Sequence, residues 1–121
     1  MAQILVVEDS ASLNRLMVLA LETEGYSVAP AHGCEEAFDG LAPDTELILL
    51  DLNLPGLDGM TCLTGVLERG FHGKVIVVSG DSDGQRMAEV TGADGFLAKP
   101  FAPEDLIATV EKHLAGNGTA V

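Results

Sequence analysis

Basic residues are scarce in this sequence. Six Lys and Arg stand against 19 Asp and Glu, which gives a formal net charge of −13. Proteins that bind nucleic acid directly usually present a basic face, so this balance argues against direct contact with DNA or RNA. The acidity is compatible with cation binding, with protein partners and with plain solubility, and only the positions of the carboxylates can decide between these.

Long apolar runs and cysteines are also lacking. No stretch approaches the length of a membrane span, and residues 1–7 have neither a charged start nor a cleavage site. We therefore expect a cytoplasmic protein that does not enter a membrane. Cys34 and Cys62 are too few and too far apart in sequence to suggest a disulfide framework or a zinc site. We interpret both as reduced thiols that serve mainly in packing.

The chain of 121 residues is long enough for one domain with a substantial core, and 47% of its residues are hydrophobic. We expect a single domain over residues 1–121, with the small residues 116–121 as a flexible tail. The sequence leaves open whether this is a stand-alone protein or a part of a longer one.

Three uninterrupted apolar runs each stop at a polar residue. They are Ile4–Val7 before Glu8-Asp9, Leu47–Leu50 before Asp51, and Val75–Val78 before Ser79. Such runs are typical of short strands that are covered on both faces, as in a parallel sheet. A shorter run, Phe96–Ala98, leads into Lys99-Pro100, and residues 26–29 alternate as an edge strand does.

Helical spacing of apolar residues fills the gaps between these strands. We expect helices over residues 10–25, 34–41, 60–70 and 103–114, and one with a weak apolar face near residues 86–91. Strand and helix thus alternate five times, with connections too short for antiparallel detours. This pattern predicts an α/β fold with a doubly wound, five-stranded parallel sheet and helices on both faces. The strand order 2-1-3-4-5 is expected by analogy with flavodoxin-like sheets.

The carboxyl ends of parallel strands share one edge of a sheet, so the polar residues that follow the runs should meet there. Glu8, Asp9 and Asp51 would repel one another and need a cation at neutral pH. Oxygen ligands with room for water favour Mg²⁺. Lys99 and Ser79 add donors, and an Asp can act as a nucleophile. The combination predicts a site for a phosphoryl group.

With these residues the chain resembles the response regulator receiver domains of two-component signalling. The resemblance covers nearly all of the sequence and rests on four motifs: Glu8-Asp9, the stretch Asp-Leu-Asn-Leu-Pro-Gly-Leu-Asp-Gly over residues 51–59, Ser79-Gly80, and Lys99-Pro100-Phe101. It implies that Asp51 accepts a phosphoryl group from the His of a partner histidine kinase or phosphotransfer protein. The chain would then catalyse only its own phosphorylation and dephosphorylation, and would not be an enzyme with an external substrate.

The resemblance also implies roles for the residues around Asp51. Asp9 and Asp51 would hold Mg²⁺ directly, with Mn²⁺ as a possible substitute, while Glu8 would act largely through water and Asn53 through its backbone carbonyl. Ser79 and Lys99 would contact the phosphoryl oxygens. The Lys99-Pro100 bond would be cis, a form that is accessible mainly before proline.

For signal output, the resemblance implies a switch that involves Ser79 and the aromatic residue at position 96. This chain has Phe96 where the family often has Tyr, which bears on how the switch works. The surface formed by the fourth helix, fifth strand and last helix would carry the output to a downstream effector protein or to a linked output domain. The same surface could mediate a dimer.

Three alternative functions fit the residues less well. A haloacid-dehalogenase-type phosphatase also uses an Asp nucleophile, but Asn53 cannot serve as its general acid and the chain has no room for a cap domain. A flavodoxin-like cofactor carrier would need a phosphate loop where the carboxylates of Glu8 and Asp9 would repel phosphate. A receiver that only docks and is never phosphorylated is disfavoured by the intact set of site residues. We expect the histidines to face solvent, and none of them is positioned as a phosphodonor, so the donor must come from elsewhere; they are His32, His72 and His113.

Overall fold

The computed structural model describes residues 3–52, 59–80, 86, 89 and 92–115 of the chain. In this part, five parallel strands form one sheet in the order β2-β1-β3-β4-β5. The strands are β1 (Gln3–Val7), β2 (Ser27–Ala31), β3 (Thr45–Asp51), β4 (Lys74–Ser79) and β5 (Gly95–Ala98). The helices are α1 (Ala11–Thr23), α2 (Cys34–Gly40), α3 (Gly59–Glu68) and α5 (Pro103–Ala115). The predicted fold class and strand order are confirmed.

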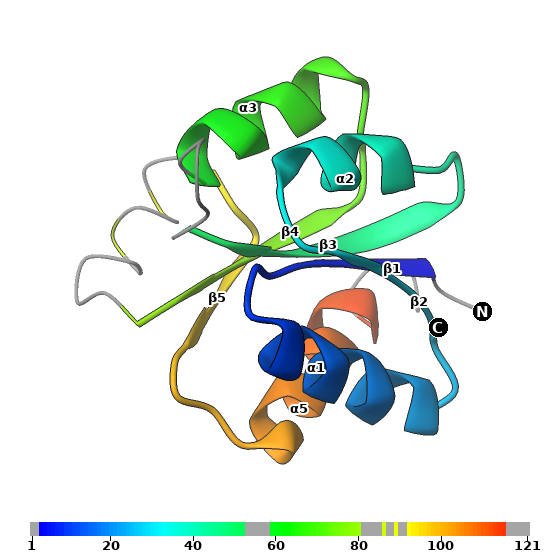
Figure 1. Cartoon of the computed structure of the whole chain (residues 1–121), viewed down its shortest axis with the longest axis vertical. Coiled ribbons are helices and arrows are strands. Elements are labelled where there is room, and N and C mark those ends of the chain that lie inside the picture. The colour runs from blue at the N-terminus through cyan, green and yellow to red at the C-terminus, as the bar shows by residue number, and fades with distance from the viewer. Residues whose placement is uncertain (1–2, 53–58, 81–85, 87–88, 90–91, 116–121) are drawn as a thin grey trace.

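The sheet is covered on both faces, as the uninterrupted apolar runs predict. Helices α2 and α3 lie on one side of it, and α1 and α5 lie on the other (Figure 1). Because successive side chains of a strand point to opposite faces, each run supplies two cores. Leu5 and Ile48 pack under α2 and α3. Ile4 and Leu47 pack against α1 and α5. All four side chains are fully or almost fully buried.

Helix α1 shows how local sequence positions an element beside the sheet. Ser10 is its N-cap, and the Ser10 side chain accepts a hydrogen bond from the backbone N–H of Leu13. Met17 and Leu21 are almost completely buried on the face that meets the sheet. The chain leaves the helix through Gly25, whose φ of +99° is a conformation that glycine adopts readily. The Ser10 cap therefore places the start of α1 directly after Glu8 and Asp9.

Some predictions differ from the structure or lie outside the part that it describes. The edge strand β2 ends at Ala31, two residues later than its alternating pattern indicates, and it contains Pro30, which an edge strand tolerates. Most of the expected fourth helix, the backbone carbonyl of Asn53 and the tail after Ala115 lie outside the described residues. No helix among the described residues is long and apolar enough to cross a bilayer.

Our interpretation of the cysteines was wrong. Cys34 and Cys62 form a disulfide, with their Cα atoms 5.7 Å apart. Their separation of 28 residues in sequence does not keep them apart in space, because α2 and α3 lie on the same face of the sheet and bring the two residues together. A pair of cysteines at the beginnings of two successive helices is the signal that could have suggested the bond.

The histidine prediction holds for His32 and His72, which are exposed, but it was wrong for His113. The His113 ring is half-buried at the end of α5. Its Nδ1 lies 2.8 Å from the carbonyl oxygen of Thr109, and its Nε2 lies 3.1 Å from that of Asp94. His113 therefore links α5 to the residue that precedes β5.

Candidate functional site

The polar residues predicted to meet at the carboxyl edge of the sheet do meet there. Asp51 and Ser79 are the last residues of β3 and β4, while Glu8 and Lys99 directly follow β1 and β5. The backbone N–H of Lys99 donates to the carbonyl oxygen of Ser79 at 2.9 Å, which fixes the start of the loop after β5. Each of these side chains owes its position to a strand end in one continuous sheet.

Three carboxylates form the acidic part of the site. Glu8, Asp9 and Asp51 each offer one carboxylate oxygen, and these oxygens lie within 4.8 Å of one another. Glu8 and Asp51 are 1% exposed, whereas Asp9 faces solvent. Carboxylates this close repel one another, and two of them have little water to screen the repulsion. The cluster is able to hold a metal ion.

Lys99 provides the positive charge that balances this cluster. Its Nζ lies 2.8 Å from Oε1 of Glu8 and donates a hydrogen bond to Oδ2 of Asp51 at 2.9 Å. Burial by itself would lower the pKa of the ammonium group. The contacts with the Glu8 and Asp51 carboxylates outweigh burial and raise the pKa of Lys99 above its usual value. Lys99 therefore stays charged and bridges the two buried carboxylates.

Glu8 keeps one oxygen that is not fully satisfied. Its Oε2 accepts a hydrogen bond from the backbone N–H of Ser10 at 3.0 Å. Its Oε1 is buried and accepts no well-directed hydrogen bond among the described residues, although the ammonium of Lys99 is within contact distance. Burial raises the pKa of Glu8, and the charge of Asp51 adds to this, while Lys99 and Ser10 oppose it. A buried oxygen of this kind suits a cation or a cation-bound water.

Asn14 supports the site from α1, and the sequence analysis missed it. The Asn14 side chain is 1% exposed, and its Nδ2 donates to the carbonyl oxygens of Glu8 at 3.0 Å and Ala31 at 2.9 Å. The carbonyl of Ala31 also accepts from the backbone N–H of Glu8 at 2.9 Å. Asn14 shares the buried helix face with Met17 and Leu21, and a polar residue on an apolar face was the available signal.

The structure also places Ser79, Phe96 and the Lys99-Pro100 bond. Ser79 is 1% exposed at the end of β4. Phe96 is half-buried in β5, in register with Val77 of β4. The peptide bond between Lys99 and Pro100 is cis.

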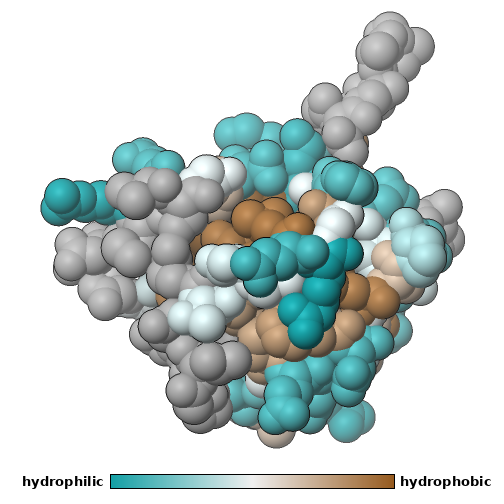
Figure 2. Space-filling view, turned by 90° about the horizontal axis from the view of Figure 1, so that it is seen from above, coloured by the Kyte–Doolittle hydropathy of each residue, from teal (hydrophilic) through white to brown (hydrophobic). Residues whose placement is uncertain are grey.

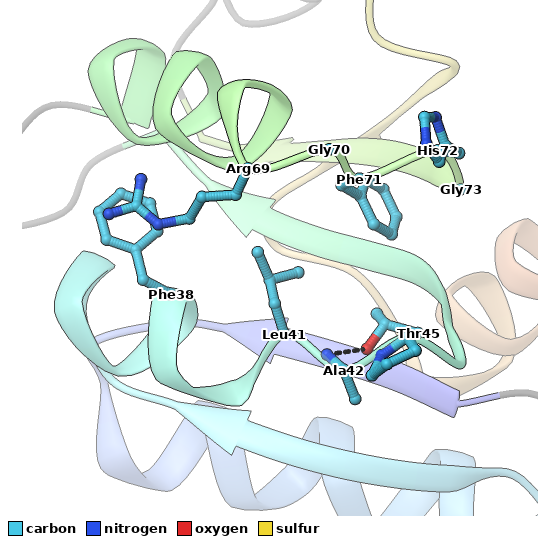
Figure 3. A pocket seen from close by; sticks show the side chains of 10 residues that line it. Phe38, Leu41, Ala42, Thr45, Arg69, Gly70, Phe71, His72 and Gly73 are labelled. Carbon is cyan, nitrogen blue, oxygen red and sulfur yellow. Dashed lines mark hydrogen bonds between the residues drawn. The ribbon is translucent and has the colours of Figure 1, made fainter.

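A pocket lies at the edge of the sheet opposite to the acidic cluster. Figure 2 shows hydrophobic residues gathered in the middle of the face that α2 and α3 cover, with hydrophilic residues around them. In this layer a pocket of about 580 Å³ opens beside Phe38, Phe71 and Thr45, and the guanidinium of Arg69 lies 3.6 Å from the centre of the Phe38 ring (Figure 3). The residues predicted for the phosphoryl site do not line it. The pocket lies at the amino ends of β3 and β4, whereas the acidic cluster lies at their carboxyl ends.

Comparison with known proteins decides the family. The profile of the response regulator receiver domain matches residues 4–111. The chain belongs to this family. It is 37% identical over 119 residues to the uncharacterized transcriptional regulatory protein YkoG of Bacillus subtilis, an alignment that covers 96% of this chain and 52% of YkoG. The receiver thus spans about half the length of the curated relatives it matches.

Solved structures agree with this assignment. A CheY-like receiver domain protein from Methanospirillum hungatei superposes with a TM-score of 0.86 at 27% identity, covering 96% of this chain and 95% of that one. The response regulator TrrA of Thermotoga maritima, solved in complex with Mg²⁺–BeF, gives a TM-score of 0.79 at 28% identity, covering 93% and 98%. The predicted resemblance to receiver domains is confirmed.

Proposed function

We propose that this receiver is switched by transfer of a phosphoryl group to Asp51. The observation that carries the proposal is the position of Asp51: it lies within 4.8 Å of two further carboxylates and is hydrogen-bonded to a lysine ammonium. A carboxylate in such a setting can act as a nucleophile, because the Lys99 ammonium, together with a cation held by the carboxylates, would offset the charge of an incoming phosphoryl group.

The proposed step is an in-line displacement. An oxygen of the Asp51 carboxylate attacks the phosphorus of a phosphohistidine on a partner kinase or phosphotransfer protein. A new O–P bond forms, the P–N bond breaks, and the imidazole leaves with the electron pair of that bond. Lys99 and Ser79 are proposed to hold the phosphoryl oxygens. Receiver domains of response regulators are generally not enzymes, and we propose that catalysis here is limited to phosphorylation and dephosphorylation of Asp51 itself.

We propose that Glu8, Asp9 and Asp51 hold Mg²⁺, with the backbone carbonyl of Asn53 as a further ligand and Mn²⁺ as a possible substitute. The all-oxygen donor set supports this because it suits a hard cation, and so does the buried Oε1 of Glu8, whose described partner is the Lys99 ammonium. When bound, the ion would offset negative charge on the phosphoryl oxygens. Before it binds, Lys99 bridges Glu8 and Asp51 and keeps their side chains in place.

For output, we propose that phosphorylation draws the Ser79 hydroxyl toward the new anion and shifts Phe96 inward. Phe has no hydroxyl to strip of water, so its inward position is easier to populate than that of Tyr. The surface formed by the fourth helix, β5 and α5 would then present the signal to an effector protein or a linked output domain, and would also serve for dimerisation. The names of the relatives as transcriptional regulators, of which this chain covers about half, support a linked output domain.

We also propose that the chain is one receiver domain over residues 1–121 and works in the cytoplasm, because it would take its phosphoryl group from a histidine kinase or phosphotransfer partner there. The whole function is tested by incubation with acetyl phosphate and Mg²⁺, followed by intact-mass measurement. A gain of one phosphoryl group that requires Mg²⁺ supports the proposal. A protein that stays unmodified would instead be a docking receiver.

A further inference from the structure

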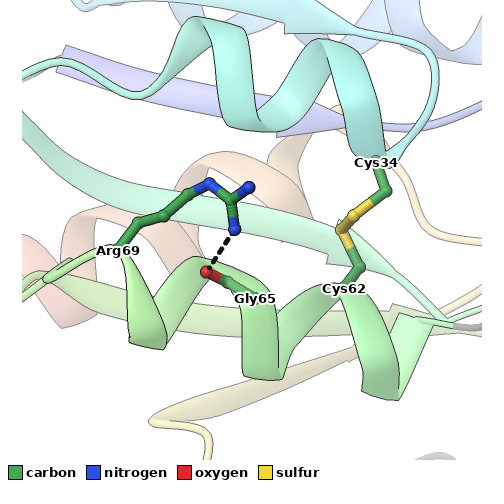
Figure 4. Close-up of a disulfide and its surroundings, with 4 residues drawn as sticks. All are labelled: Cys34, Cys62, Gly65 and Arg69. Atoms are coloured by element: carbon green, nitrogen blue, oxygen red, sulfur yellow. Dashed lines mark hydrogen bonds between the residues drawn. A yellow bond between two sulfur atoms is a disulfide. The ribbon is translucent and has the colours of Figure 1, made fainter.

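The disulfide between Cys34 and Cys62 lies at the ends of α2 and α3 that are nearest the acidic cluster. Cys34 is the first residue of α2, three residues after β2 ends, and Cys62 is the fourth residue of α3, the helix that follows β3 in the chain. Figure 4 shows the bond joining these two helix starts. Both cysteines are buried, with Cys34 6% and Cys62 0% exposed.

The far parts of the same helices are held together differently. The guanidinium of Arg69 lies over the ring of Phe38 in α2 (Figure 3). Nη1 of Arg69 also donates to the carbonyl oxygen of Gly65 at 3.1 Å, which holds the guanidinium against α3 (Figure 4). An added Cβ at Gly65 would lie 2.6 Å from Cζ of Phe38, which shows how closely the two helices approach there. These contacts do not involve sulfur. Loss of the disulfide would therefore free the helix starts and leave the far contacts in place.

Hydrogen bonds connect the segment just before Cys34 to Glu8, a member of the acidic cluster. The carbonyl of Ala31, three residues before Cys34, accepts from the backbone N–H of Glu8 and from Nδ2 of Asn14. On the other side, Asp51 is the last residue of β3, the strand that leads to α3 and Cys62. The covalent bond thus ties α3, the helix that follows the strand of Asp51, to the start of α2, close to the Ala31 carbonyl that contacts Glu8.

We propose that the Cys34–Cys62 disulfide is redox-responsive and controls how well ordered the side chains of the acidic cluster are. It would thereby control how readily the receiver binds its cation and is phosphorylated. This inference rests on the proposed function and adds a second input to the same site. In a compartment where histidine kinases work, lasting structural disulfides are rare, and those present are usually redox-sensing or catalytic. A bond placed beside the site and away from the other α2–α3 contacts fits a sensing role.

The reaction is thiol–disulfide exchange with a dithiol reductant. A thiolate of the dithiol attacks the sulfur of Cys34, the more exposed of the two, and Cys62 leaves as a thiolate. The second thiol of the reductant then attacks the mixed disulfide and releases Cys34. Two electrons pass from the dithiol to the protein, the dithiol becomes a disulfide, and the two cysteines end as thiols after proton uptake.

Reduction should loosen the starts of α2 and α3 and thereby weaken cation binding, because the carboxylates are then less preorganised. In the reduced protein, hydrogen exchange of the amides over residues 34–36 and 59–62 should speed up by about tenfold or more. Exchange over residues 65–69 should stay unchanged. The dissociation constant for Mg²⁺ should rise by about fivefold or more.

The experiment compares oxidised protein with protein reduced by dithiothreitol and alkylated only at the end, so that the number of thiols is counted in every sample. Hydrogen exchange is followed without metal, and Mg²⁺ is added in a separate calorimetric titration. The matched control is Cys34→Ala with Cys62→Ala, which should behave like the reduced protein whether or not dithiothreitol is present. Should the double variant not fold, the two states of the unchanged chain carry the comparison.

Faster exchange at the helix starts together with weaker Mg²⁺ binding upholds the redox input. Two results overturn it: a bond that dithiothreitol leaves intact in the folded protein, or a reduced protein with unchanged exchange and unchanged Mg²⁺ affinity. None of these readouts uses a phosphoryl group. A failure of Asp51 phosphorylation would therefore be recognised separately.

Discussion

The side-chain amide of Asn14 donates a hydrogen bond to the carbonyl oxygen of Glu8 at 3.0 Å, so a helix residue fixes the backbone that carries a site carboxylate. Asn14→Ala should lower the free energy of unfolding by about 1–3 kcal/mol, because the carbonyl of Glu8 loses its buried partner. Urea denaturation measures this. The carbonyl of Ala31 still accepts from the N–H of Glu8, which limits the loss.

Asn14→Asp is the matched control for this prediction. Its side chain has nearly the same shape but offers no amide donor, and when ionised it brings a further negative charge near Glu8. It should therefore be at least as destabilising as Asn14→Ala. Stability equal to that of the unchanged chain in both variants would contradict the role assigned to Asn14.

Lys99→Met should destabilise the metal-free protein by about 2–3 kcal/mol, because it leaves two buried carboxylates close together without their cation. We expect a smaller loss of stability than for a fully buried ion pair, because the Lys99 side chain is 24% exposed and water screens its charge in part. Saturating Mg²⁺ should remove much of the difference, since the ion then balances Glu8 and Asp51. Thermal and urea unfolding with and without Mg²⁺ check this. Lys99→Arg, which keeps the charge, should lose less, and an equal loss in both variants would argue that the ammonium charge is unimportant.

Glu8 should make the metal-free protein less stable as the pH rises. Burial raises the pKa of Glu8 in the folded state above the value of 4.5 expected when it is exposed. The folded state then binds more protons than the unfolded state, so the contribution of Glu8 to stability is fully present below the unfolded pKa and is lost as the pH rises through the folded pKa. Relative to the unchanged chain, Glu8→Gln should gain stability over this window, from about pH 4 upward. Unfolding free energies measured in parallel for both proteins test this, and a constant difference would refute it.

The close approach of α2 and α3 makes Gly65 sensitive to size. Gly65→Ala should lower the unfolding free energy by about 1–3 kcal/mol in the unchanged chain, because the new methyl group meets the ring of Phe38. In a Phe38→Ala background the same change should be neutral or stabilising by up to about 1 kcal/mol, since alanine favours helix more than glycine does. A double-mutant cycle gives the coupling. Equal effects in both backgrounds would show that the ring does not set the limit.

The sequence predicts the strands and the positions of the polar residues at their ends because these depend on short-range patterns. An apolar run that stops at Asp51, or one that leads into Lys99, indicates a buried strand and its end. In a parallel sheet the ends of neighbouring strands must meet. The contact between Lys99 and Asp51 spans 48 residues and passes the end of β4, which lies between β3 and β5. It therefore depends on the strand order, which we expected by analogy, and on the long side chain of Lys99.

Other contacts depend on how helices pack, which a periodic pattern does not specify. The pairing of Cys34 with Cys62 requires the relative position of α2 and α3, and the half-buried setting of His113 depends on where the turn before β5 passes α5. Asn14 shows a third kind of limit. Its place on the apolar face was visible in the sequence, but the two carbonyl groups it serves come from other elements.

The central claim is that Asp51 accepts the phosphoryl group, and the most direct measurement is to locate that group. The protein is incubated with acetyl phosphate and Mg²⁺, and peptides are analysed for a label that hydroxylamine releases, as it does from an aspartyl phosphate. We expect the label on the peptide that contains Asp51, at one group per chain, and its absence in Asp51→Asn. Undiminished labelling of Asp51→Asn, or a label on another residue of the unchanged chain, would contradict the account.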